Sequence, residues 1–206
     1  VKIDWEKMIA GTPTHEGGIV AKNGRHCGLS ALKLSDTETY IKAQFWTWED
    51  REVGVEFRDV WINVNNQSEF MDIGMIHDKK NKKITISVDG NTKEINYTGE
   101  IIDYRDSWIW VGANNSLDSC AEEHRGFLFG EISSMIICDN INDGVSNYLD
   151  ISTYEDMCKL LNHEQVAAAY SFTEKTKTPY KVFDISQNGN HMILFDNKWM
   201  ATDSII

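Results

Sequence analysis

Residues 40–48 read Tyr-Ile-Lys-Ala-Gln-Phe-Trp-Thr-Trp, and two kinds of side chain alternate along them. Every second position carries a residue suited to a protein core: Ile41, Ala43, Phe45 and Thr47. The positions between them mix aromatic rings with polar groups: Tyr40, Lys42, Gln44, Trp46 and Trp48. Because successive residues of a β-strand point to opposite faces of a sheet, this repeat predicts a strand with one face on the core.

The same repeat of two extends to most of the chain. It returns at residues 53–57, 60–64, 83–89, 108–111, 127–132, 135–138 and 166–172. Asp89 and Gly90 end one of these runs and predict a hairpin turn, since glycine accepts a positive φ at little steric cost. Only residues 152–161 show a helical spacing, with a capping serine and acidic residues at the start. The sequence therefore predicts an all-β fold with one short helix.

The alternation changes phase near Asp59. Val55 and Phe57 belong to one phase, whereas Val60 and Ile62 belong to the other. A slip of one residue exchanges the two faces of a strand, so the change predicts a turn or a bulge at this point.

The chain has 206 residues and a formal net charge of −12. This length suits a single domain over residues 1–206, which can bury its own core. No apolar run approaches the roughly 18 residues of a membrane span, so we expect no insertion into a membrane. We also expect no nucleic-acid partner, because nucleic-acid-binding proteins carry clustered positive charge. Since the first residue is Val1, we expect the chain to be part of a longer protein.

The four cysteines lie at positions 27, 120, 138 and 158, with no Cys-x-x-Cys pair and no cluster with histidine. This spacing does not suit a metal site. Two interpretations stay open. The cysteines are buried free thiols, or Cys120 and Cys138 form a disulfide.

Several runs follow one another in an informative order: residues 70–78, 82–90, 109–112, 126–132 and 184–191. Together they resemble the strands and the Asp-x-Ser-Gly-Asn-Gly-Asn-His run of laminin-G-like domains, with Gln187 in place of the usual glycine. The resemblance implies the concanavalin A-like lectin and glucanase fold, an antiparallel β-sandwich of jelly-roll type with one short helix. Such domains occur in phage tail proteins and secreted bacterial proteins, which implies an extracellular or virion-surface location.

The polar and aromatic positions of residues 40–48 predict a binding face. Sugars stack their apolar faces on flat rings and exchange hydrogen bonds with amides and charged groups. We therefore expect this face to bind a glycan or a cell-surface polysaccharide through Tyr40, Lys42, Gln44, Trp46 and Trp48. If the following strand lies alongside, the row extends to Glu56, Arg58, Trp61 and Asn63. The alternative is that Trp46 and Trp48 lie under a loop as part of a small second core.

Calcium is the only cofactor that the sequence suggests. Several laminin-G-like domains bind calcium at a loop rim, and the resemblance suggests Asp184, Asn188 and Asn190 as its ligands. The same residues also suit an Asx turn followed by an Asn-Gly hairpin, which needs no cation.

No catalytic residues are predicted. Glycoside hydrolysis needs two carboxylates about 5 to 10 Å apart, and Glu49, Asp50 and Glu52 lack the spacing that hydrolases of this superfamily use. Residues 40–44 are faintly similar to a strand of alginate lyases, but that family's Gln-x-His and Arg-x-Glu-Leu strands are absent. We therefore predict a non-catalytic recognition module. One alternative is a structural module that contacts other chains or domains of a parent assembly, and another is an unrecognised polysaccharide lyase or glycoside hydrolase.

Overall fold

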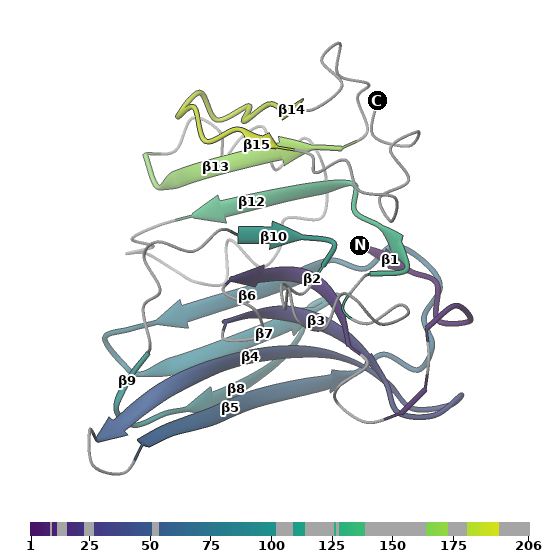
Figure 1. Ribbon diagram of the computed structural model, residues 1–206, viewed down its shortest axis with the longest axis horizontal. Coiled ribbons are helices and arrows are strands. Elements are labelled where there is room, and N and C mark those ends of the chain that lie inside the picture. Colours follow the sequence, from purple (N-terminus) through teal and green to yellow (C-terminus); the bar gives the residue numbers. More distant parts are fainter. Residues whose placement is uncertain are drawn as a thin grey trace. The chain divides into compact units, whose positions relative to one another are not determined.

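The computed structural model describes residues 1–8, 10–11, 16–22, 27–50, 54–101, 109–113, 126, 128–138, 164–172 and 181–193. Every regular element in these residues is a β-strand, so the all-β prediction is confirmed (Figure 1). The helix predicted over residues 152–161 lies outside the described residues. Contacts divide the chain into a first unit, Lys2–Glu131, and a second unit, Ile132–Ile206, to which Val1 also belongs. The single domain over residues 1–206 stays a prediction.

The largest sheet of the first unit is antiparallel and joins six of the described strands (Figure 1). Five of them follow in the order β10 (Ile109–Val111), β2 (Gly17–Lys22), β3 (Cys27–Lys33), β4 (Thr39–Asp50) and β5 (Gly54–Asn63). The sixth, β9 (Glu100–Ile101), pairs with β4 at Thr47 and Trp48, beyond the last pair that β4 makes with β3. β4 is therefore the strand to which β3, β5 and β9 all attach.

A second sheet packs against β4 and β5 and encloses the core of the first unit. It consists of the antiparallel strands β6 (Ile73–Asp78), β7 (Lys83–Val88) and β8 (Asn91–Asn96). The Phe45 ring meets the Tyr97 ring edge-on, with centroids 5.5 Å apart. The buried residues of these layers include Ile41, Ala43, Phe45, Ile84, Ile86 and Val88. The predicted core face of residues 40–48 is thereby confirmed.

The predicted hairpin turn joins β7 to β8. Asp89 and Gly90 have φ values of 48° and 79°, so both central residues are left-handed, as the tight hairpin turn requires. The Asp89 carboxylate accepts a hydrogen bond from the Asp72 N–H at 2.8 Å and another from the Gln67 side-chain amide at 2.8 Å. These bonds fasten the turn to the segment before β6.

The remaining strands form short two-stranded sheets. In the first unit, β1 (Lys2–Ile3) pairs with β11 (Gly130–Glu131). In the second unit, β12 (Ser134–Cys138) pairs with β13 (Val166–Ser171), and β14 (Lys181–Val182) pairs with β15 (Met192–Ile193). A separate core fills the second unit, made of Ala168, Tyr170 and Val182, with Met135, Ile137, Phe172 and Met192 packed against them.

The turn or bulge predicted near Asp59 is wrong. β5 pairs with β4 without interruption from Val55 to Asn63, and the register shifts only at the other end of β4, between Trp48 and Asp50. Arg58 lies opposite Phe45, so a half-buried arginine occupies a core-side position. Arginine tolerates such a position because its aliphatic stem packs on apolar neighbours. The change of phase therefore concerns only which residue types occupy each face of β5. The backbone register of the strand does not change.

Cys27 and Cys138 are free thiols, and burial raises the pKa of both. The alternative of a Cys120–Cys138 disulfide is therefore not realised, because Cys138 keeps its thiol within the paired strand β12. Cys120 and Cys158 lie outside the described residues.

Gly28 marks a close approach of β3 to β2. A Cβ atom at this position would lie 2.1 Å from the main-chain oxygen of Val20, and β10 pairs with Val20 on the other side of β2. We expect Gly28→Ala to lower the free energy of unfolding by at least about 2 kcal/mol, because neither strand has room to move away. Urea unfolding followed by tryptophan fluorescence measures this loss.

Gly90→Ala is the control for this variant. A Cβ atom at Gly90 would meet nothing within 4 Å, so only its φ of 79° is strained. That strain costs about 1 kcal/mol. Equal losses in the two variants would contradict the close approach at Gly28.

Candidate functional site

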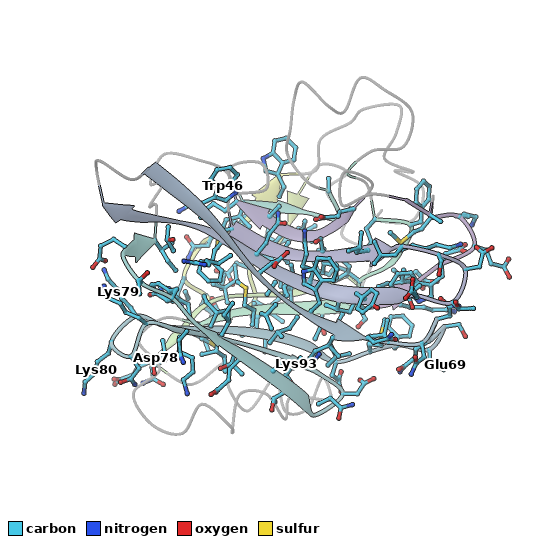
Figure 2. All side chains as sticks on the ribbon, turned by 90° about the horizontal axis from the view of Figure 1, so that it is seen from below. Trp46, Glu69, Asp78, Lys79, Lys80 and Lys93 are labelled. Atoms are coloured by element: carbon cyan, nitrogen blue, oxygen red, sulfur yellow. The ribbon has the colours of Figure 1, made fainter. Side chains whose placement is uncertain are left out.

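The polar and aromatic residues of β4 lie on the face of the largest sheet that is turned away from the second sheet; we call this the outer face. In Figure 2, Trp46 lies on one side of β4, and Asp78, Lys79 and Lys80 of the second sheet and its turn are labelled on the opposite side. Residues directly opposite each other in antiparallel strands share a face. The outer face therefore includes Tyr40, Lys42, Gln44 and Trp46, with Ser30 of β3 and Asp59 and Trp61 of β5.

A buried ion pair lies on the outer face. The Lys42 Nζ pairs with the Glu16 carboxylate, and both residues are 1% exposed. Ser30 is also 1% exposed and donates its hydroxyl to the other carboxylate oxygen of Glu16 at 2.9 Å. Because a buried charge is costly unless it is paired and hydrogen-bonded, each of these groups depends on the others.

Four half-buried aromatic rings of the described residues lie on this face with the ion pair: Tyr40, Trp46, Trp61 and, through the pairing of β10 with β2, Trp110. The Lys42 Nζ lies 5.9 Å from the centre of the Trp61 ring, a cation–π contact. The Tyr40 and Trp61 rings are tilted against each other with centroids 5.6 Å apart. The indole N–H of Trp61 has no hydrogen-bond acceptor in the described part of the chain. The Trp61 ring is thus held by two neighbours, and its own N–H is buried.

Most of the residues predicted to bind a ligand meet on the outer face: Tyr40, Lys42, Gln44, Trp46 and Trp61. Arg58 does not, because β5 continues without a slip and places Arg58 opposite Phe45 on the core face. This corrects the predicted row. The side chains of Trp48 and Glu56 lie outside the described residues, and their main chains pair with Val55 and Thr47.

The outer face also differs from the predicted row in its exposure. Lys42 is 1% exposed and Gln44 is 3% exposed, so neither side chain is open to solvent. The aromatic rings are the partly accessible groups. The site therefore consists of partly accessible aromatic rings beside a buried cluster of polar side chains. Glu16 and Ser30 belong to the same polar cluster and were not predicted. The only signal for them was that a buried lysine needs a counter-charge.

The second candidate region of the sequence, around Asp184, forms a hydrogen-bonded loop in the second unit. The Asp184 carboxylate is 6% exposed. Its Oδ1 accepts bonds from the Ala169 N–H at 3.0 Å, the Ser186 N–H at 2.9 Å and the Ser186 hydroxyl at 2.6 Å. Its Oδ2 accepts the Asn190 N–H at 3.0 Å. Burial by itself raises the pKa of Asp184, but these bonds outweigh it and hold the pKa below its usual value.

Both asparagines of this loop point their amide nitrogens at the main chain of β13. Asn188 donates to the Val166 oxygen at 2.7 Å, and Asn190 donates to the Ala167 oxygen at 2.8 Å. The bond from the Ser186 N–H to Asp184 is that of an Asx turn. The loop between β14 and β15 is therefore fastened to β13 by side chains at both of its ends.

These residues do not fit a calcium ion as they stand. A calcium ligand offers oxygen lone pairs to the cation, whereas both oxygens of Asp184 already accept bonds from N–H and O–H donors. In the described ranges, moreover, no three His, Cys, Asp or Glu side chains gather as metal ligands. The calcium site at Asp184, Asn188 and Asn190 stays a prediction that this geometry does not favour.

A pocket of about 930 Å³ lies elsewhere in the first unit, between the segment of residues 2–7, the turn after β3 and residues 128–131. Two ion pairs lie along it: Asp4 with Lys7 at 2.8 Å, and Lys33 with Asp36 at 3.0 Å. The Lys33 Nζ also donates to the Trp5 main-chain oxygen at 2.9 Å. None of the predicted site residues lines this pocket.

A histidine–tyrosine pair lies on the second sheet. The Nε2 of His77 is 2.7 Å from the Tyr97 hydroxyl. Burial lowers the pKa of His77, which favours its neutral form, and raises the pKa of Tyr97. Such a pair can share a proton, but it belongs to a different sheet from the aromatic rings of the outer face.

Comparison of the chain with protein-family models, curated proteins and solved structures found no match. Within the described ranges, no helix has the length and apolar character needed to cross a membrane.

Proposed function

We propose that this chain is a non-catalytic recognition module that binds a glycan on the outer face. The observation that carries the proposal is the Trp61 ring, which is half-buried and is held by Lys42 and Tyr40 on a face that carries further aromatic rings. An aromatic ring stacks on the apolar face of a sugar. Trp46 and Tyr40 supply further rings on the same face.

The buried ion pair supports this function by fixing the rings. Movement of the Lys42 ammonium group away from the Trp61 ring would also break its ion pair with Glu16. Breaking this pair is costly because both charges are buried. A ring that is already held in place loses little conformational entropy when a ligand stacks on it, which favours binding.

The resemblance to laminin-G-like domains agrees with this proposal. In a concanavalin A-like jelly roll, glycan binding is a common role, and such modules belong to phage tails and to secreted proteins. An extracellular or virion-surface location is part of the proposal.

Substitution of Trp61 tests the binding face. In a glycan array followed by titration of the best ligand, we expect Trp61→Ala to weaken binding at least about tenfold, since a stacked ring contributes more than 1 kcal/mol. Quenching or enhancement of tryptophan fluorescence on binding is expected in the unaltered protein and should shrink in the variant.

Phe70→Ala is the matched control, because Phe70 is an exposed aromatic residue (48%) outside the outer face. Binding should be unchanged in this variant. If Trp61→Ala is folded and binds as tightly as the unaltered protein, the proposed face is wrong.

A structural module is the second candidate, and the burial of Lys42 and Gln44 favours it. A face whose lysine and glutamine are buried can serve packing within a parent assembly as well as ligand binding. Absence of any glycan binding by the folded chain would support this candidate, whereas turnover of a bound polysaccharide would support the lyase or hydrolase alternative.

A further inference from the structure

The charges of the outer face do not cancel. Lys42 is neutralised by Glu16 within the buried pair. Asp59 lies on β5 directly opposite Gln44 and is half-buried. Its carboxylate has no hydrogen bond or ion pair with any of the described residues, and Arg58 beside it lies on the core face. The described part of this face therefore keeps one uncompensated negative charge next to the rings.

A carboxylate in this position attracts some sugar groups and repels others. Its two oxygens accept hydrogen bonds from neighbouring hydroxyls, and charge-assisted bonds of this kind are stronger than neutral ones. The same carboxylate repels a uronate or a sulfate group, because like charges brought together at a partly desolvated site are unfavourable. The net charge of −12 for the whole chain acts in the same direction.

We propose that Asp59 is a sugar-binding residue of the outer face and that the face selects neutral glycans over anionic ones. This inference rests on the proposed function and narrows it. The rings provide stacking, which tolerates many sugars, and Asp59 provides the discrimination by charge.

The test compares pairs of oligosaccharides that have the same linkage and anomeric configuration and differ only in oxidation of the sugar C6, such as fragments of β-mannan and polymannuronate or of β-glucan and glucuronan. For the unaltered chain we expect the neutral member of at least one pair to bind at least about tenfold more tightly. In Asp59→Asn we expect weaker binding of the neutral sugar and a preference reduced to about threefold or less.

Glu69→Gln is the matched control, because it removes one exposed carboxylate away from the face (Figure 2). It should keep the preference of the unaltered chain, which separates a local effect of Asp59 from the effect of net charge. As a measurement that needs no variant, added salt should strengthen binding of the anionic members and leave that of the neutral members unchanged.

Each outcome has a definite meaning. Tighter binding of anionic glycans would overturn this inference and leave glycan binding itself standing. An unchanged preference in a folded Asp59→Asn variant would also overturn it. If no oligosaccharide of either kind binds, both the inference and the proposed function fail.

Discussion

We expect Lys42→Met to lower the free energy of unfolding by about 3–5 kcal/mol, because the substitution leaves the Glu16 carboxylate buried without its cation. Glu16 is 1% exposed and also accepts a hydrogen bond from the Ser30 hydroxyl at 2.9 Å. A hydrogen bond from a hydroxyl does not replace the positive charge of the lysine. Urea unfolding near neutral pH, followed by tryptophan fluorescence, measures the loss.

Two further variants make this experiment specific. In Lys42→Met/Glu16→Gln the buried charge is removed together with its partner, so most of the lost stability should return. Lys93→Met removes an exposed lysine of β8 and should have little effect (Figure 2). A loss below about 1 kcal/mol for Lys42→Met would mean that solvent reaches the ion pair, as it does for surface pairs.

The second large effect is expected at Asp184. In Asp184→Asn an N–H₂ group replaces one carboxylate oxygen and faces donors such as the Asn190 N–H, so at least one N–H loses its acceptor. We expect a loss of about 2–4 kcal/mol in the stability of the second unit. Hydrogen exchange of the Ala169 amide, which donates to Asp184, reports the loss directly.

The stability that Asp184 contributes also depends on pH. Hydrogen bonds hold its pKa below the ordinary value, so the folded state binds this proton less readily than the unfolded state. The contribution is therefore complete above the unfolded pKa of about 3.9 and is lost as the pH falls through the folded value. Protection of Ala169 should decline on acidification in the unaltered chain, and this part of the decline should be absent from Asp184→Asn. Glu164→Gln, an exposed change in the same unit, should keep it.

Local patterns predicted the parts of the fold that depend on nearby residues. The alternation along β4 predicted its core face, because the period of a strand is a local property. The pair Asp89 and Gly90 predicted the hairpin between β7 and β8 for the same reason, since turn geometry is set by the φ values of two residues.

The partner of Lys42 could not be predicted. Glu16 lies 26 positions earlier and reaches Lys42 only because β2, β3 and β4 pair in one particular register. Register is fixed by packing of the whole sheet and not by the alternation within one strand. Among 32 acidic residues, the sequence offers no reason to choose Glu16.

The change of phase near Asp59 was misread for a related reason. Alternation reports burial only where one face of a strand is apolar and the other polar. β5 instead carries Arg58 on the core face and Trp61 on the outer face, so residue type and face no longer coincide. A strand that contributes to a candidate site is where such a mismatch is expected.

The loop around Asp184 was predicted in part. The Asx turn follows from the short spacing of Asp184 and Ser186. The attachment of the loop to β13 is a contact distant in sequence, and the spacing gave no sign of it. Gln187 has a φ of 71°, a left-handed conformation that glycine adopts at less steric cost.

β5 is also an edge. Among the described strands it pairs only with β4, so the N–H and C=O groups along its other side have no strand partner there. An unpaired edge of ten residues is a template for another copy of the chain, and natural proteins discourage such pairing with charged side chains. Arg58 and Asp59 put one charge on each face in the middle of this edge. We therefore expect the Asp59 carboxylate, besides its role in sugar selection, to discourage a second copy of the chain from pairing along this edge.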